Sequence, residues 1–147
     1  MSRHIRAPRA RVYAVLLDPV AVQQWMVPDG MTSEVHEFDA REGGAFRISL
    51  TYDEPTRSGK TSAHTDTHHG RFVRLVPETE VVQLVEFETD DPELRGEMTI
   101  SYTLTDVGDG TDVVSIHEGI PAGVSPADNE LGTTMALDKL ARLAETE

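Results

Sequence analysis

The chain has 147 residues, the length of a single domain, and 38% of them are hydrophobic, enough for a buried core. Its formal net charge of −13 at pH 7 argues against nucleic acid and anionic membranes as partners, because both surfaces would repel it. With no cysteine the chain has neither disulfide nor thiolate chemistry. Without a long apolar run or a signal peptide, the expected location is the cytoplasm.

The N-terminal segment predicts a short strand followed by two short helices. Residues 3–6 are the candidate strand, and Pro8 marks a helix start because proline suits the first helical turn. Apolar residues follow at helical spacing until Asp18–Pro19 interrupts them. A second short helix then ends near Trp25, and a loop follows it.

The middle of the chain has the period-two apolar pattern of half-buried strands. In residues 96–106, Met98, Ile100, Tyr102 and Leu104 alternate with hydroxyl side chains. A polar loop is expected at residues 53–63, where Gly and Pro occur. The predicted strands are residues 32–40, 43–52, 64–76, 80–88, 96–106 and 111–119.

The C-terminal segment predicts one long helix. Ser125 is the expected N-cap, Pro126 takes the first helical position, Asp128 lies in the first turn, and the helix runs to about Ala144. Strands segregated from helices indicate an α+β domain with an antiparallel sheet, spanning residues 1–147. The apolar face of that sheet needs a cover, and the C-terminal helix is the element long enough to supply it.

Five short motifs, in this order of elements, resemble the SRPBCC superfamily of helix-grip proteins. This superfamily includes START and birch-pollen-allergen proteins, polyketide cyclases and lipid-transfer proteins. The last two motifs resemble the branch of homologues of the activator of heat-shock protein 90 ATPase. The motifs are AP with LLD and Trp25 (7–25), FDAREGGAFR (38–47), VP with E and V (76–81), HEGIP (117–121), and DNELG with LDKLA (128–141).

The resemblance implies a curved antiparallel sheet of about seven strands wrapped around the C-terminal helix, with a cavity between them. It implies no single activity, because members of this fold bind ligands, catalyse reactions or do neither. Thr133 stands where this branch usually has an aromatic residue, and Ser115 stands where an aliphatic one is frequent. Both departures remove side-chain volume from the place where the cavity would lie.

The stretch HTDTHHG, residues 64–70, raises the question of a metal site. On a strand, His64, Asp66 and His68 share one face, and that set of ligand types suits zinc. His68 also shares its parity with Phe72, which is expected to point inward, so His69 is expected to face solvent. Because His64 and Asp66 adjoin a polar loop, we expect them to be exposed. We therefore predict no metal and no cofactor.

Three other residues have two readings each. His117 shares its parity with Ser115 beside the C-terminal helix, so it either contacts a polar group of a ligand or is satisfied by backbone or by Glu118. Tyr102 either fills the core or brings its hydroxyl to the ligand. Trp25 is either a lid over the cavity or a plain anchor.

The phase of the strand at residues 80–88 also stays open. Glu86 and Glu88 share a parity, and an inward carboxylate could act as a general base. The opposite phase, with Val85 and Phe87 inward, fits the pattern equally well.

Three functions are compatible with these observations. The first is a protein that binds a small hydrophobic or amphipathic molecule. The second is a cyclase- or hydrolase-like enzyme that uses His117, His68 and Tyr102. The third is a co-chaperone-like partner of an ATPase. We rank binding first, and a non-enzyme over an enzyme, because no pair of groups is set for acid–base work. The predicted ligand-binding residues are Trp25, Phe46, Ile48, His68, Phe72, Met98, Ile100, Tyr102, Ser115, His117, Thr133 and Leu137.

Helical angles of about 100° per residue predict an apolar patch on the outer face of the C-terminal helix. Thr133, Ala136 and Leu137 are assigned to the sheet side, which places Leu131 and Met135 nearly opposite. Two apolar residues one turn apart on an exposed face favour a homodimer; the alternatives are that they are simply exposed or that loop residues such as Val27 or Met31 cover them.

Overall fold

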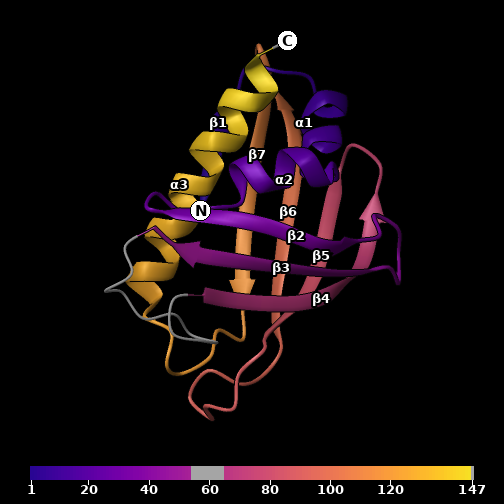
Figure 1. Cartoon of the computed structure of the whole chain (residues 1–147). Helices are drawn as coiled ribbons and strands as arrows, with labels where there is room; N and C mark the ends of the chain where they lie inside the picture. The colour runs from indigo at the N-terminus through magenta and orange to yellow at the C-terminus, as the bar shows by residue number, and fades with distance from the viewer. Residues whose placement is uncertain (54–64, 147) are drawn as a thin grey trace.

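The computed structural model describes residues 1–53 and 65–146 and shows seven strands and three helices (Figure 1). The α+β helix-grip prediction is confirmed, and the elements agree with those expected from the sequence to within about two residues at each end. The elements are β1 (Ser2–Ile5), α1 (Arg9–Leu16), α2 (Pro19–Trp25), β2 (Met31–Phe38), β3 (Ala45–Tyr52), β4 (Thr65–Val76), β5 (Glu80–Phe87), β6 (Met98–Val107), β7 (Gly110–Glu118) and α3 (Pro126–Glu145). His64 and most of the expected polar loop lie outside the described residues.

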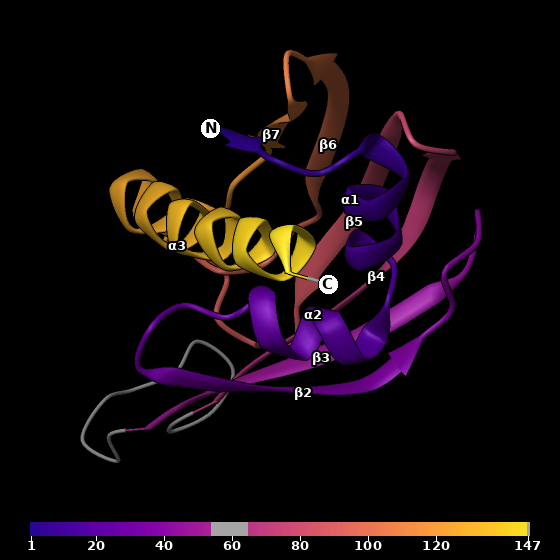
Figure 2. The same cartoon turned by 90° about the horizontal axis from the view of Figure 1, so that it is seen from above.

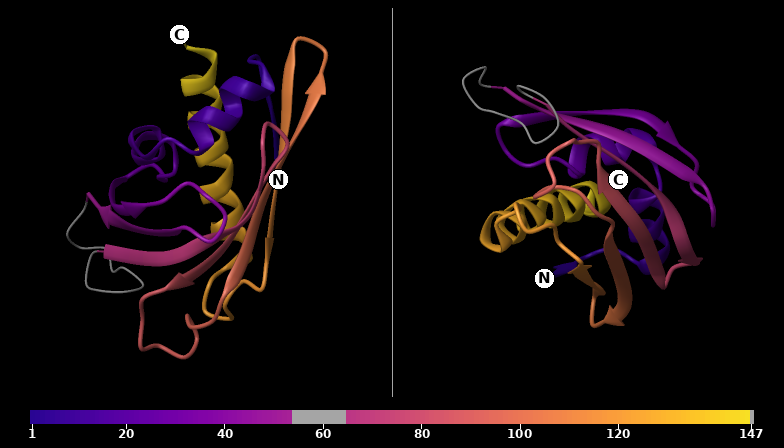
Figure 3. Two further views of the ribbon diagram at one scale, coloured as in Figure 1. Left: turned by 90° about the vertical axis from the view of Figure 1, so that its right-hand side faces the viewer. Right: turned by 90° about the horizontal axis from the view of Figure 1, so that it is seen from below.

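All seven strands form one antiparallel sheet in the order β1-β7-β6-β5-β4-β3-β2. Every step from β2 to β7 is therefore a connection between neighbours, and β1 closes the far edge beside β7. The sheet curls from β6 and β7 round to β2 and β3, with α3 on its inner side, as the view from above (Figure 2) and the view from below (Figure 3) both show. No helix in the described part of the chain is long and apolar enough to cross a membrane.

The starts of α2 and α3 follow from local chemistry. The Ser125 side chain accepts a hydrogen bond from the Asp128 amide at 3.3 Å, and Pro126 follows it in the first turn. The Asp18 side chain caps α2 in the same way, accepting from the Val20 amide at 2.9 Å.

The two halves of α3 lie in different surroundings. The buried residues of α3, which are Leu137, Leu140, Ala141 and Ala144, all belong to its C-terminal half. That half packs against β1, α1 and α2 and completes the main core. The N-terminal half carries exposed or half-buried side chains. Helix α3 therefore covers one end of the curled sheet tightly and leaves space at the other.

Candidate functional site

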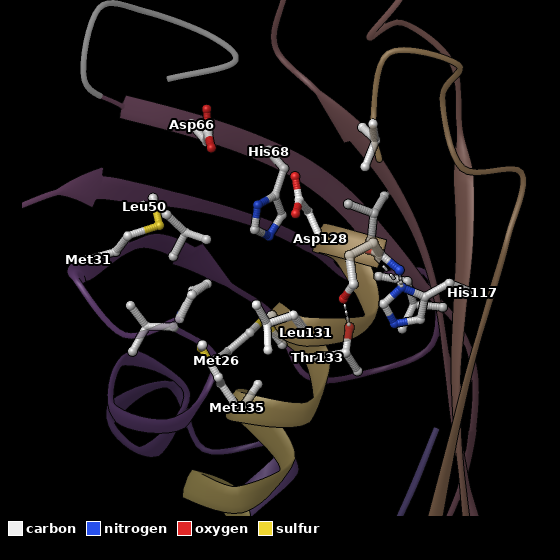
Figure 4. A pocket seen from close by; sticks show the side chains of 18 of the residues that line it. Met26, Met31, Leu50, Asp66, His68, His117, Asp128, Leu131, Thr133 and Met135 are labelled. Atoms are coloured by element: carbon white, nitrogen blue, oxygen red, sulfur yellow. Dashed lines mark hydrogen bonds between the residues drawn. The ribbon is translucent and has the colours of Figure 1, made fainter. Parts of the chain in front are cut away.

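A cavity of about 610 Å³ lies between the N-terminal half of α3 and the inner face of the sheet (Figure 4). This volume is within the range of roughly 300–1,000 Å³ that holds drug-sized molecules. Its walls come from the loop after α2, from β2 to β7, from the segment before α3 and from the first turns of α3.

One side of the cavity is an apolar wall rich in methionine. Met26, just after α2, and Met31, the first residue of β2, face Leu131 and Met135 from α3, and Leu50 of β3 lies beside Met31 (Figure 4). Methionine is unbranched and polarisable, so such a wall adapts to ligands of different shape. Leu131 is 56% exposed, which places it at the rim.

The floor of the cavity is set by the register of three neighbouring strands. Gln83 of β5 lies opposite Ile100 of β6, which in turn lies opposite His117 of β7. This row faces inward and lines the cavity. The phase of β5 is thereby resolved: Gln83 is buried and Glu86 points to the outer face.

His117 pairs with the helix across the cavity. Its ring Nδ1 lies 3.0 Å from the Asn129 amide nitrogen and 3.3 Å from the amide oxygen. The partner is therefore neither backbone nor Glu118. Burial lowers the pKa of His117, while the bond to Asn129 partly opposes that shift, so the ring is neutral near pH 7. Its Nε2 is covered and has no partner within the described chain.

Tyr102 brings a phenol to the inner end of the cavity. The residue is 5% exposed, and its ring meets that of Trp25 edge to face with the centroids 6.0 Å apart. Burial raises the pKa of Tyr102 far above its ordinary value, so the hydroxyl stays protonated. Trp25 is 1% exposed and does not line the cavity. Trp25 is therefore an anchor beneath Tyr102 and not a lid.

The start of β4 contributes Asp66 and His68 to the cavity wall. The expected exposure of Asp66 was wrong, because the residue is 3% exposed. Asp66 pairs with Leu50 of β3 inside the sheet, so strand parity and not the neighbouring loop decides its direction. The His68 ring packs edge to face on Phe46, with ring centroids 6.2 Å apart. His69 faces outward as expected, where it contacts two glutamates.

Within residues 1–53 and 65–146, no group of three or more His, Asp or Glu side chains could hold a metal ion. His64, one member of the triple considered from the sequence, lies outside that range.

The structure divides the predicted ligand-binding set in two. The residues that line the cavity are His68, Met98, Ile100, Tyr102, His117 and Thr133. The residues that belong to the core and not to the cavity wall are Trp25, Phe46, Ile48, Phe72, Ser115 and Leu137. Expecting this second group to line the cavity was wrong, because α1, α2 and the C-terminal half of α3 fill that end of the sheet.

The sequence reasoning missed several lining residues. Met26 follows the end of α2 and Met31 begins β2, one residue before the predicted strand, so the periodicity gave neither residue a direction. Asn129 had no signal of its own, whereas Gln83 had one, as a polar residue inside the apolar run VVQLV. Leu131 and Met135 were assigned to the outer face of the helix, but they line the cavity. The predicted homodimer therefore loses its premise, which was an apolar patch formed by these two residues on the outer face of the helix.

Comparison with known proteins gives one family. The model of the family described as "Activator of Hsp90 ATPase homolog 1-like protein" matches residues 6–145. None of the curated proteins matches the chain in sequence. A crystal structure of a protein from Chromobacterium violaceum is 33% identical, covers 100% of this chain and 96% of its own, and has a TM-score of 0.89.

Two more distant structures share the fold alone. A crystal structure from Rhodobacter sphaeroides is 20% identical over 99% of this chain and 91% of its own, with a TM-score of 0.80. The solution structure of an AHSA1-like protein from Aeromonas hydrophila is 18% identical over 99% of this chain and 90% of its own, with a TM-score of 0.72.

Proposed function

The chain belongs to the family of activator of Hsp90 ATPase homolog 1-like proteins, and within that family we propose that it binds a small hydrophobic or amphipathic molecule. The observation that carries the proposal is the cavity of about 610 Å³ between α3 and the sheet. Protein interiors are close-packed, so the packing of the core does not account for a space of this size. The apolar wall suits the body of such a ligand, and the neutral polar floor suits a polar group on it.

The test is binding of a neutral fluorescent probe, N-phenyl-1-naphthylamine, to the purified protein. We expect saturable binding that Ala136→Trp weakens roughly tenfold or more, since the indole fills the cavity that Ala136 lines. The matched control is Ala127→Trp, on the exposed side of the first turn of α3, which should bind normally. Thermal melting confirms that both variants are folded. A wild-type protein that binds neither this probe nor any molecule retained from its own host contradicts the proposal.

A second candidate, a cyclase- or hydrolase-like enzyme, is favoured by one observation. His117 is oriented by Asn129 on the same floor as Tyr102, and a positioned imidazole beside a phenol is a usable acid–base pair. The covered Nε2 of His117 weighs against it, because that atom does not reach the cavity surface. Once a bound molecule is identified, turnover of it by the wild type and not by His117→Gln would support this alternative.

The co-chaperone role rests on the description of the family alone. Its test is the ATPase rate of the heat-shock protein 90 from the same host, measured with and without the chain. A rate unchanged at saturating chain would remove this alternative.

A further inference from the structure

Gln83 and Tyr102 each present to the cavity a polar group that has no hydrogen-bond partner among the described residues. Gln83 is 4% exposed and Tyr102 is 5% exposed, and both line the cavity. Within the described residues, neither the Gln83 amide nor the Tyr102 hydroxyl forms a hydrogen bond. Neither group is completely covered by other protein atoms. These groups therefore open toward the cavity and not into packed protein. A buried amide or hydroxyl in this condition is satisfied only when something in the cavity bonds to it.

The sheet register brings these two side chains together. Gln83 of β5 lies opposite Ile100, and Tyr102 follows two residues along β6, opposite Val81. Gln83 and Tyr102 are therefore diagonal neighbours on one face, about 7–8 Å apart at the backbone and within reach of long side chains. Packing on Trp25 fixes the Tyr102 ring. One group of a ligand can bond to both.

The charges around the cavity restrict what that group can be. The lining residues that the structure describes include Asp29, Asp66 and Asp128 but no lysine and no arginine. Among these described lining residues a carboxylate or phosphate would find no lysine or arginine to pair with, which makes its desolvation costly.

A cationic head is not favoured either, because two of the aspartates are already engaged and the third is exposed at the rim. Asp29 forms an ion pair with Lys139 at 3.1 Å, and Asp66 has an interaction partner of its own. Asp128 is exposed in the first turn of α3, where the helix dipole already stabilises it.

We propose that Gln83 and Tyr102 form the anchor for an uncharged hydrogen-bonding group, a hydroxyl or carbonyl, on the ligand whose apolar body lies along the methionine wall. The ligand is then a neutral amphipathic molecule and not a fatty acid or an anionic lipid. The assignment rests on the proposed binding function, and it names a chemical class for the same cavity. The neutral state of Tyr102 and His117 near pH 7 agrees with it.

The test uses three probes that share the same alkyl chain and differ in the head group: 1-decanol, decanoate and decylammonium. Each displaces N-phenyl-1-naphthylamine from the wild-type protein at pH 8. We expect 1-decanol to bind roughly tenfold more tightly than decanoate, since only the anion has to enter unpaired. Decylammonium should also bind less tightly than 1-decanol.

Two variants remove one polar group each while keeping the shape of the side chain. Tyr102→Phe and Gln83→Leu should each weaken 1-decanol binding about fivefold, because each removes one hydrogen bond in a dry site. Decanoate should remain the weaker ligand of the wild type, because its carboxylate has to be desolvated without a described lysine or arginine to pair with. The matched controls are Tyr13→Phe and Gln24→Leu, at residues that do not line the cavity. The preference among heads is measured in the wild type, so it stands even where a variant folds poorly.

The outcomes separate this inference from the proposed function. If the fluorescent probe binds but decanoate or decylammonium competes as well as 1-decanol, the anchor is wrong and the binding function stands. The same holds if neither variant weakens 1-decanol. If no probe binds, the anchor fails, and the binding function fails with it when no molecule is retained from the host either.

Discussion

At the scale of single residues, Arg47, His69 and Glu88 form a charged cluster on the outer face of the sheet. Arg47 donates two hydrogen bonds to the Glu88 carboxylate, at 2.8 and 2.9 Å, and His69 Nδ1 lies 3.0 Å from it. The bonds from Arg47, the largest cause, and those from His69 lower the pKa of Glu88 from 4.5 to about 2. This carboxylate thus stabilises the fold above its unfolded pKa, and that contribution is lost as the pH falls from 4.5 toward 2.

Replacing this carboxylate should lower stability above about pH 4.5, and the loss should vanish near pH 2. We expect Glu88→Gln to reduce the free energy of unfolding by about 1 kcal/mol at pH 7, because solvent screens a partly exposed pair. The deficit should shrink toward zero between pH 4.5 and about 2, where the wild-type carboxyl also becomes neutral. Urea unfolding across this range measures it. Glu86→Gln, whose carboxylate keeps a 3.5 Å contact to His69, is the control for losing one outer glutamate. A deficit independent of pH would contradict the assignment.

At the scale of elements, the sequence predicts the strands, the capped helices and their order well. The signals for them are local: the alternation of apolar residues, the cap at Ser125 and the prolines at helix starts. The position of α3 over the sheet is not a local property. It depends on contacts of Leu140 and its neighbours with α1, α2 and β1, segments far away in the chain. The sequence therefore predicts that Met98, Ile100, Tyr102 and His117 face inward, but not which inward residues meet the cavity and which meet the core.

Two glycines differ in how much space the neighbouring elements leave for a side chain. A Cβ at Gly70 of β4 would lie 1.8 Å from the Leu84 carbonyl oxygen of β5, whereas a Cβ at Gly132 in α3 would come no nearer than 3.8 Å to Pro28. Gly70→Ala should therefore destabilise the protein by at least about 2 kcal/mol, since the backbone must shift. Gly132→Ala should stabilise it by up to about 1 kcal/mol, because alanine favours the helix. Thermal and urea unfolding of both variants measure the contrast, and equal effects would mean that the close β4–β5 approach is wrong.

The loop after α2, which forms one wall of the cavity, is held on α3 by Lys139. Its Nζ donates to the Val27 carbonyl at 2.6 Å and pairs with Asp29 at 3.1 Å. Lys139→Met keeps the apolar stem and removes the charge, so the loop should open more often. We expect N-phenyl-1-naphthylamine to dissociate roughly fivefold faster, measured by stopped flow, since most affinity changes within one site appear in the off-rate. Arg142→Met, exposed on the same helix, should leave the rate unchanged, and an unchanged rate in Lys139→Met would show that the loop does not gate the cavity.

At the scale of the whole molecule, Leu131 connects the question of assembly with that of binding. Its helical angle suggested an outer patch with Met135 and hence a homodimer. In the fold both residues line the cavity, because the loop after α2 comes up beside them. The net charge of −13 also opposes self-association. The exposed part of Leu131 is thus the rim of a binding site, and the dimer stays a prediction without its original basis.

Leu131→Glu distinguishes these roles in one variant. We expect the wild type and the variant to sediment alike at tens of micromolar, at low and at high salt. Binding of N-phenyl-1-naphthylamine should weaken roughly fivefold, because an apolar contact worth about 1 kcal/mol is replaced by a charge. Val20→Glu is the matched control, since Val20 is 64% exposed on α2 and does not line the cavity. It should change neither property. A wild-type dimer that Leu131→Glu dissociates, with probe binding intact, would restore the helix face as an interface and remove it from the binding site.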